Sequence, residues 1–352
     1  MKGYKGFNPG LICKDKQYQE NTVFEEPEAK IREKGMHFCE NPFDVLDYYD
    51  LIRSDGTPNE FAEVEALDEP KTDDKKKFCS RKLKIGVKLG LSGFVKACVD
   101  FVLEKTIAEM PSENVDSGNY AQIGSSGNYA QIGSSGNYAQ IGSSGNSAQI
   151  GSSGNYAQIG SSGYSARIDS SGYSARIGSS GNYAQIGSSG NSAQIGSSGN
   201  SAQIGSSGYS AQIGSSGDSA QIGSSGYSAQ IGSSGYSARI DSSGYSARIG
   251  SSGNYAQIGS SGNYAQIGSS GDFAKINCTG SNSVICCAGH GSVVKAPIGC
   301  WITLAEWGYD GAKQRYVPVC VKTEYIDGEK IKADTPYMLE NGEFVEAESD
   351  GE

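Results

Sequence analysis

A nine-residue repeat occupies the middle of the chain and constrains its fold more than any other feature. From Gly118 the sequence reads G-N-Y-A-Q-I-G-S-S and recurs seventeen times to Ser270, followed by a diverged eighteenth copy, Gly271 to Thr279. Position four is Ala and position six is Ile in all eighteen copies, whereas positions two, three and five vary. A constant short period is typical of solenoid proteins, in which each repeat packs on its neighbours.

The invariant positions predict a buried face. Side chains alternate between the two faces of a strand, so Ala and Ile two residues apart point the same way. Positions three and five then face outward, and G-S-S-G supplies the turn. One Ile contributes roughly 1.5–3 kcal/mol against a backbone cost of about 1–2 kcal/mol per residue, so the repeats must stack. The predicted core ladder is exemplified by Ala121, Ile123, Ala130, Ile132, Ala193, Ile195, Ala265 and Ile267.

Two repeats per coil make an 18-residue turn that places an Ile/Ala layer between two parallel sheets. Eighteen repeats then form nine coils, and at about 4.8 Å per coil the solenoid would be about 43 Å long. A coil with three faces can be built from the same length of chain, so the sequence leaves the cross-section open. The predicted fold is mainly β: a parallel β-solenoid between an N-terminal α+β capping domain and a C-terminal antiparallel β cap.

Two other interpretations of the repeat are less consistent with the sequence. A disordered Gly/Ser linker suits the composition, since residues 118–279 hold 33 of the 50 Gly, but a linker needs no Ile at a fixed spacing. A calcium-binding nonapeptide roll needs an Asp in every copy. Here the acidic residues are scattered over two positions, at Asp169, Asp218, Asp241 and Asp272.

The variable positions form a predicted surface ladder. Tyr occurs at position three or at position two, and Arg occurs only in copies with Tyr at position two. Guanidinium–ring stacking is one explanation, and duplication is another, because the block 163–189 recurs at 235–261. Sorting alternate repeats into two sheets leaves Tyr and Ser mixed on both, which argues against an ice- or polysaccharide-binding lattice. The ladder is represented by Tyr120, Tyr129, Tyr164, Arg167, Tyr236 and Arg239.

Both flanks have the features of caps, which a solenoid needs to protect its exposed strand edges. After a predicted strand at 83–89, apolar residues spaced by three and four predict an amphipathic capping helix over about 91–108. Residues 280–297 resemble two eroded repeats, with Ile285 and Val294 in the Ile position. The predicted domains are 1–117, 118–297 and 298–352.

The C-terminal segment is predicted to form an antiparallel meander with an acidic tail. Its strands, at 300–307, 316–325 and beyond, are separated by Asp-Gly at 310–311 and 327–328 and by Asn-Gly at 341–342. These dipeptides are typical of hairpin turns.

Charge and cysteine content limit the class of function. The net charge of −10 lies at the two ends, which carry −5 and −6, and Lys and Arg are nowhere concentrated. The chain is therefore not expected to bind nucleic acid through a basic surface. We also expect no targeting signal or membrane span. The nine cysteines include no C-x-x-C pair, which favours reduced thiols and a cytoplasmic protein.

Few residues suggest chemistry. One imidazole and four thiols fall close together near the C-terminal end, but their spacing is poor for zinc, and small turn residues are the favoured interpretation of the thiols. These residues are Cys278, Cys286, Cys287, His290 and Cys300. His37 and Cys39 would share a strand face, but no third group orients them for nucleophilic catalysis. We expect neither a metal nor a cofactor.

Residues 1–110 resemble an N-terminal domain of unknown function that is common in phage and prophage proteins. The resemblance lies in K-G-Y-K-G-F-N, in G-M-H-F-C-E-N-P-F-D-V-L-D-Y-Y and in E-F-A-E-V-E. Such domains are often followed by polymorphic short repeats. The resemblance implies a phage origin.

The same region also resembles the ADP-ribosyltransferase fold, in which three strands carry a basic residue before Gly, an aromatic segment followed by a Tyr, and a Glu. By this resemblance Lys5 stands at the first place, the segment 35–39 with His37 and then Tyr48 or Tyr49 at the second, and Glu63 or Glu65 at the third. Lys replaces the usual His or Arg, and no Ser-Thr-Ser is present. The resemblance implies a domain that binds or uses NAD or a related nucleotide.

Taken together, these features predict a non-enzymatic, phage- or prophage-encoded scaffold whose partner is a host or phage protein. The partner would be recognised mainly at the capping domains, and the scaffold could inhibit a host factor. The alternatives are a nucleotide-using N-terminal domain and a virion or tail component. An acidic rod that imitates DNA is disfavoured, because the repeat itself is nearly neutral.

Overall fold

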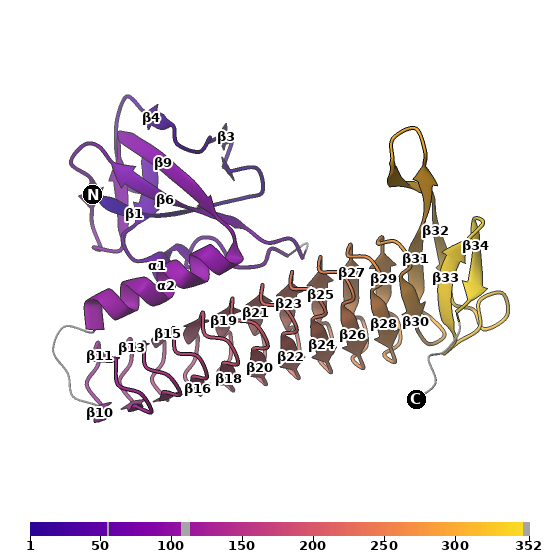
Figure 1. The fold of residues 1–352 in the computed structure, drawn as a ribbon. Helices are drawn as coiled ribbons and strands as arrows, with labels where there is room; N and C mark the ends of the chain where they lie inside the picture. Colours follow the sequence, from indigo (N-terminus) through magenta and orange to yellow (C-terminus); the bar gives the residue numbers. More distant parts are fainter. Residues whose placement is uncertain (55, 107–112, 348–352) are drawn as a thin grey trace. The chain divides into compact units, whose positions relative to one another are not determined.

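The computed structural model describes residues 1–54, 56–106 and 113–347. It is mainly β, with a parallel β-solenoid of about ten turns between residues 122 and 304, an α+β region before it and antiparallel strands after it (Figure 1). The predicted fold class is therefore confirmed. The chain divides into an N-terminal unit, Met1–Ala184 with Gln194–Ser198, and a C-terminal unit, Gln185–Ala193 with Gly199–Glu352, which are described separately.

The N-terminal unit begins with a seven-stranded antiparallel sheet in the order β4-β9-β6-β1-β5-β8-β7. Its strands are short, and a separate two-stranded hairpin, β2–β3, follows the first of them. The bounds are β1 (Lys2–Phe7), β2 (Ile12–Cys13), β3 (Lys16–Gln17), β4 (Val23–Glu25), β5 (Met36–Cys39), β6 (Glu60–Ala66), β7 (Lys71–Thr72), β8 (Lys77–Ser80) and β9 (Lys82–Leu89).

Each face of this sheet carries its own apolar core. Phe7, Met36 and Ile85 belong to the core on one face. On the other face Phe61 packs against two helices, α1 (Pro42–Val45) and α2 (Leu91–Thr106). Asn41 caps α1 by accepting a hydrogen bond from the backbone N–H of Phe43 at 3.0 Å. No helix in the described ranges is long and apolar enough to cross a bilayer.

Most solenoid strands have the pattern Gln/Arg-Ile-Gly-Ser, which is positions five to eight of the repeat, and β10 (Glu113–Asp116) precedes the first repeat. In the N-terminal unit the solenoid strands are β10, β11 (Gln122–Ser125), β12 (Gln131–Ser134), β13 (Gln140–Ser143), β14 (Gln149–Ser152), β15 (Gln158–Ser161), β16 (Arg167–Ser170), β17 (Arg176–Ser179) and β19 (Gln194–Ser197). Within this unit one sheet has the order β10-β12-β14-β16, and the other contains β11, β13, β15, β17 and β19.

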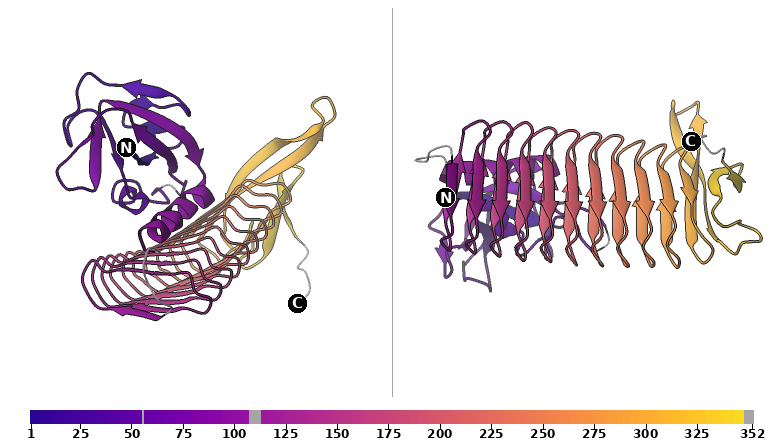
Figure 2. Two further views of the ribbon diagram at one scale, coloured as in Figure 1. Left: turned by 60° about the vertical axis from the view of Figure 1, so that its left-hand side comes forward. Right: turned by 90° about the horizontal axis from the view of Figure 1, so that it is seen from below.

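The C-terminal unit continues the same alternation. Its regular strands are β18 (Gln185–Ser188), β20 (Gln203–Ser206), β21 (Gln212–Ser215), β22 (Gln221–Ser224), β23 (Gln230–Ser233), β24 (Arg239–Ser242), β25 (Arg248–Ser251), β26 (Gln257–Ser260), β27 (Gln266–Ser269), β28 (Lys275–Cys278), β29 (Val284–Cys287) and β30 (Val293–Lys295). Even-numbered and odd-numbered strands lie in separate sheets, and Figure 2 shows these successive coils.

Within each unit, residues of the repeat strands pair with their equivalents in the next coil. Ile123 lies beside Ile141 and Ile213 beside Ile231, so two repeats make one coil with two parallel sheets. The predicted ladder residues Ala121, Ile123, Ala130, Ile132, Ala193, Ile195, Ala265 and Ile267 are all buried between the sheets. Ser at position eight shares this inward face. The eroded repeats keep the register, because Ile285 pairs with Ile267 and Val294 with Ile276.

The turn differs from the sequence prediction. The first Gly and the first Ser of the G-S-S-G segment belong to the strand, and the chain turns through positions nine, one, two and three instead. In most copies the position-three residue has a left-handed backbone, with φ of 62° at Tyr120 and 60° at Ser192. Asn at position two stabilises this turn, because Asn119 Oδ1 accepts the backbone N–H of Asn137 at 3.0 Å. Position three therefore lies in a turn and not on the outer face of a strand.

The tyrosines consequently form runs of stacked rings along the turns, where we expected an unordered mixture. Tyr120, Tyr138 and Tyr156 follow one another with ring centroids 5.0 Å apart and nearly parallel planes. Tyr164 with Tyr183 and Tyr236 with Tyr255 are also neighbours, at 5.3 and 5.1 Å, but their ring planes are tilted by 51° and 52°. Tyr129 has Ser147 in the equivalent place of the next coil, so its run stops there.

Two arginines of the predicted surface ladder form ion pairs with carboxylates. Guanidinium–ring stacking was the interaction considered from the sequence. Arg167 Nε lies 3.0 Å from Asp169 Oδ2, and Arg239 Nε lies 2.9 Å from Asp241 Oδ2. In both repeats Arg and Asp are two residues apart on the outer face of one strand, which brings their side chains together. The pairs are exposed, so each contributes about 0–1 kcal/mol.

Helix α2 does not cap the first coil, as the sequence suggested, but lies across the strands β11, β13, β15, β17 and β19 (Figures 1 and 2). Position seven of the repeat makes this close packing possible. A Cβ atom on Gly160 would lie 3.2 Å from the Cα of Val99, and one on Gly178 would lie 3.6 Å from its Cγ2. The outward glycines of neighbouring strands thus form a glycine track under the helix. Residues 107 and 108 of the predicted helix lie outside the described residues.

The C-terminal strands form two hairpins that extend different sheets. β31 (Trp301–Asp310) first runs parallel to β29 and then pairs with β32 (Arg315–Tyr325), whereas β33 (Pro336–Glu340) joins β30 and pairs with β34 (Glu343–Glu346). The prediction of a continuous meander is therefore wrong at Asp327, where no hairpin turn joins β32 to β33. Its carboxylate accepts backbone N–H groups at 329–331 and shapes a connection between the sheets. The end of the acidic tail, from residue 348, lies outside the described residues.

Candidate functional site

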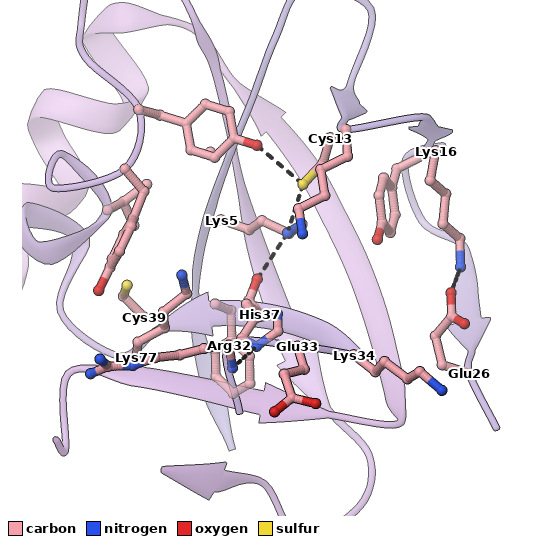
Figure 3. Close-up of a pocket in the computed structure, with 18 of the residues that line it drawn as sticks. Lys5, Cys13, Lys16, Glu26, Arg32, Glu33, Lys34, His37, Cys39 and Lys77 are labelled. Atoms are coloured by element: carbon pink, nitrogen blue, oxygen red, sulfur yellow. Dashed lines mark hydrogen bonds and ion pairs between the residues drawn. The ribbon is translucent and has the colours of Figure 1, made fainter. Parts of the chain in front are cut away.

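The N-terminal region contains a cavity of about 760 Å³, a volume suited to a small molecule. β1 and β5 pair only through Tyr4 and Cys39, so the two strands separate beyond this pair and leave space between them. The cavity is lined by these strands, the β2–β3 hairpin, the segments 26–35 and 45–49, and the start of β8 (Figure 3).

Lys5 is the most buried charged side chain of the cavity, with 5% of its surface exposed. Its Nζ donates a hydrogen bond to the carbonyl of His37 at 2.9 Å and lies 3.5 Å from Cys13 Sγ (Figure 3). Lys5 therefore bridges β1 and β5 where the strands have separated. Burial lowers the pKa of the Lys5 ammonium, and the neighbouring Cys13 partly opposes this effect.

Cys13 receives a second donor from the segment after α1. The hydroxyl of Tyr49 donates to Cys13 Sγ at 3.1 Å. Tyr49 reaches this place because Gly6 has no side chain: a Cβ atom there would lie 2.6 Å from the Tyr49 ring. Burial, with help from Cys13, raises the pKa of Tyr49, so its phenol remains a hydrogen-bond donor at neutral pH.

His37 lies on the opposite wall as a neutral imidazole. Its Nε2 accepts the backbone N–H of Arg32 at 2.9 Å. Burial lowers the pKa of His37 to about 4, and the positive charges of Lys77, Lys5 and Lys14 add to this shift. The three lysines therefore create a positive potential within the cavity.

The cavity has more basic than acidic side chains. Its basic residues are Lys5, Lys14, Lys16, Arg32, Lys34 and Lys77, and its acidic residues are Asp15, Glu26, Glu28 and Glu33. Lys16 pairs with Glu26, Lys34 with Glu28, and Arg32 with Asp73 and Asp74. Across the described part of the chain, no carboxylate forms an ion pair with Lys5, Lys14 or Lys77.

The residues suggested by the ADP-ribosyltransferase resemblance divide between two hollows. Lys5, His37 and Tyr48 line the cavity. Glu63 and Glu65 line a separate hollow of about 580 Å³. The register explains this division: in the antiparallel pair of β1 and β6, Tyr4 lies opposite Glu63 and Lys5 opposite Ala62, so Lys5 and Glu63 point in opposite directions. The five candidates do not form one site.

His37 and Cys39 both line the cavity, but the thiol is not set up for nucleophilic attack. Cys39 is 2% exposed. Burial, reinforced by Asp44, raises its pKa to about 12. A thiol with this pKa is protonated at neutral pH and reacts slowly.

The C-terminal thiols are structural parts of the last coils. Cys278 Sγ and Cys300 Sγ both lie 3.4 Å from the carbonyl of Gly280, and a hydrogen bond between the two thiols lowers the pKa of Cys278 to about 7. Cys287 is also buried, Cys286 is exposed, and His290 packs its ring against Phe273. Within residues 1–54, 56–106 and 113–347, no three His, Cys, Asp or Glu side chains are placed to share a metal ion.

Sequence reasoning missed Cys13, Lys14 and Lys77 as members of the site, and it named Tyr49 only as an alternative to Tyr48. Lys77 begins β8 and holds its Nζ 3.9 Å from the centroid of the Tyr48 ring. The three missed residues lie in two segments without a motif. The only signal was the closely spaced glycines of K-G-Y-K-G-F, which allow side chains to cross over a strand.

Residues 1–97 match the family described as a domain of unknown function, DUF7666. This match covers the seven-stranded sheet, the cavity and the first half of α2. No curated protein and no solved structure matches the chain.

Proposed function

We propose that the protein is a non-enzymatic, phage- or prophage-encoded scaffold that uses its solenoid to hold the N-terminal domain in a fixed orientation toward a host or phage protein. The proposal of a phage origin is supported by the resemblance of residues 1–110 to phage and prophage domains. Recognition is assigned to the N-terminal domain and the C-terminal hairpins, and the regular coils act as the support between them. A scaffold of this kind could occupy and inhibit a host factor.

The observation that carries this proposal is the interface between α2 and the first coils. Arg176 of β17 pairs with Asp47 and lies 3.9 Å from Asp44, whose side chain is only 8% exposed. Asn41 Nδ2 donates to Gln158 Oε1 at 3.0 Å. Together with the glycine track under α2, these contacts join the domain to the solenoid within one compact unit. A rigid connection of this kind favours presentation of the domain over free movement on a tether.

The C-terminal hairpin offers a second recognition surface. Val319 and Val321 of β32 are each 64% exposed, and Tyr309 and Tyr316 beside them are 61% and 53% exposed. Large apolar side chains that remain in water on one hairpin are typical of a protein-binding surface.

The test is capture of partners from infected and uninfected bacterial lysates with four tagged proteins. The full-length chain is compared with an in-register deletion of residues 163–234 and with a hairpin variant, Val319→Ser with Val321→Ser. The fourth protein is an N-terminal variant that replaces two exposed apolar side chains of the domain, Tyr48→Ala with Leu67→Ala. We expect the deletion to keep the partner, because it removes only coils. A partner lost with the deletion but kept by the hairpin variant and by a Tyr48→Ala, Leu67→Ala variant would place recognition on the coils and contradict the proposal.

The nucleotide-using alternative is supported only by Lys5, His37 and Tyr48, which share the cavity. Glu63 points away from Lys5 and, with Glu65, lines a separate hollow. Incubation with labelled NAD tests this alternative directly. Transfer of label to a protein that is abolished by Glu63→Gln or Glu65→Gln would replace the scaffold proposal with an enzymatic one, whereas unchanged NAD removes the alternative. The virion alternative is tested by immunodetection of the protein in purified phage particles.

A further inference from the structure

The cavity of the N-terminal domain holds a buried cation that lacks a counter-ion. An ammonium group has three hydrogen-bond donors, and burial of a charge is costly unless it is paired. Lys5 Nζ has one oxygen acceptor, the His37 carbonyl. Its other contacts are the Cys13 sulfur at 3.5 Å and the rings of Phe7 and Tyr18, whose centroids are 5.4 and 5.5 Å away, and none of these is a carboxylate. A side chain of this kind weakens the fold by itself, so its presence is better explained by something that it binds.

Two further lysines add charge to the same space. Lys14 follows the hairpin strand β2 and has no ion pair with a described carboxylate, and Lys77 has its Nζ over the ring of Tyr48 at 3.9 Å. The ring positions Lys77 without neutralising it. All three lysines lower the pKa of His37, so their charges act on one region of the cavity.

The remaining wall is aromatic and apolar. Tyr18, Phe38, Val45 and Tyr49 line the cavity beside the lysines. A volume of about 760 Å³ lies in the range of pockets that hold small organic molecules. A ligand that fits has a compact anionic group for the lysines and an apolar or planar remainder for the rings.

We propose that this cavity binds a small phosphate-bearing metabolite, with Lys5 as the buried anchor for the phosphate and with Lys14 and Lys77 completing its charge neutralisation. Phosphate is favoured over a single carboxylate because three cations that pair with no described carboxylate match a group that carries up to two negative charges. The proposal goes beyond scaffolding, since it gives the N-terminal domain a ligand of its own. Loss of this ligand site would leave protein capture by the C-terminal hairpin unaffected, so the two proposals can fail separately.

Cys13 provides a reporter inside the cavity. It is half-buried and lines the cavity, whereas Cys286 is exposed and lies in the solenoid. Full-length protein is treated with iodoacetamide alone and with inorganic phosphate, AMP or adenosine, and alkylation of each cysteine is followed by peptide mass spectrometry. We expect phosphate and AMP at about 10 mM, roughly tenfold above a millimolar Kd, to slow alkylation of Cys13 by about tenfold and to leave Cys286 unchanged.

The phosphate-free probe distinguishes the two parts of the ligand. Adenosine is expected to leave alkylation of Cys13 unchanged. Equal protection by adenosine and AMP would show that the rings alone bind the probe and would overturn the role of the lysines. No protection by either phosphate or AMP would overturn the proposal as a whole.

Substitutions test the anchor. Lys5→Met keeps the length of the side chain and removes its charge, so we expect protection by AMP to be lost while thermal stability is unchanged or higher. Lys84→Met, an exposed position on β9 outside the cavity, is the matched control and should retain protection. If Lys5→Met unfolds the domain, the double variant Lys14→Gln, Lys77→Gln tests the role of the lysines without changing a core residue. Protection equal to that of the unmodified protein in this double variant would contradict the proposal.

Discussion

Replacement of Arg176 by Gln tests how the solenoid holds the N-terminal domain. Arg176 comes from the outer face of β17, its side chain is 15% exposed, and it pairs with Asp47 and approaches Asp44. The chain contains its own control. The repeats 172–180 and 244–252 have the same sequence, G-Y-S-A-R-I-G-S-S, but Arg248 of the second has no ion pair within the described residues.

The expected cost follows from the burial of Asp44. Removing one partner of a buried pair costs about 3–5 kcal/mol because the other charge is left uncompensated, and the partial exposure of Asp47 favours the lower end, about 3 kcal/mol at pH 7. Arg248→Gln should change the free energy of unfolding by no more than about 0.5 kcal/mol. The same substitution in two identical repeats therefore separates the ion pair from any effect on the coil.

The cost should also depend on pH. Burial raises the pKa of Asp44 above its ordinary value of 3.8, and Lys76 and Arg176 limit this rise. A carboxyl whose folded pKa is raised stabilises the fold most when it is protonated, and this stability is lost as pH rises through the folded pKa. Without Arg176 the pKa of Asp44 rises further. The difference between Arg176→Gln and the unmodified protein should therefore grow between about pH 4 and pH 7, and near pH 4 only about 1 kcal/mol should remain from the lost hydrogen bond.

Hydrogen exchange at several pH values measures this local effect. Peptides covering α1 and α2 report the opening of the interface, and peptides from the C-terminal unit serve as an internal reference. We expect faster exchange in α1 and α2 of the Arg176→Gln variant after correction for intrinsic rates. Equal exchange in the Arg176→Gln and Arg248→Gln variants, or a difference that does not change with pH, would refute the reasoning.

Three further predictions concern the coils. Gly160→Val should disturb α2 and cost about 1–3 kcal/mol, because a Cβ atom there meets Val99 at 3.2 Å, whereas Gly151→Val has nothing within 4 Å and should be neutral; equal melting temperatures of the two variants would mean that α2 does not pack on the glycine track. Ile195→Ala should cost about 2–5 kcal/mol in urea unfolding, since Ile195 is fully buried, and an unchanged midpoint would show that this face is not a core. Deletion of residues 163–234 should leave a folded protein with a β-rich circular dichroism spectrum, because the segment that moves into place repeats the deleted one; aggregation would show that the coils are not interchangeable.

The solenoid was largely predictable because its interactions connect like with like. Each Ile pairs with the Ile of the next coil, so the period and the inward side chains follow from one repeating pattern, whereas the choice of two sheets over three faces was left to the structure. The pattern did not determine which residues form the turn. Ala, Ile and Ser at positions four, six and eight all fit the alternation of a strand, so the alternation does not mark where the strand ends. The strand end depends on the left-handed residue at position three, such as Tyr120.

The candidate site was predictable only in part. Lys5, His37 and Tyr48 were identified and lie together, but Glu63 and Glu65 were assigned to the same site without knowledge of the strand register. A shift of one residue in register moves a side chain to the other face of a sheet. Tyr4 and not Lys5 lies opposite Glu63, so Lys5 and Glu63 are on opposite faces of the sheet.

The sequence by itself therefore determined the β-solenoid, since every coil is specified by neighbours with the same side chains. Only the tertiary structure decided where α2 packs, how the cavity forms and which sheets the final hairpins extend. These features depend on contacts between unlike residues far apart in the chain, such as Lys5 with the carbonyl of His37 and Arg176 with Asp47, 129 residues earlier. Such contacts leave no period in the sequence, because each is made once, by surfaces that come together only after the local elements have formed.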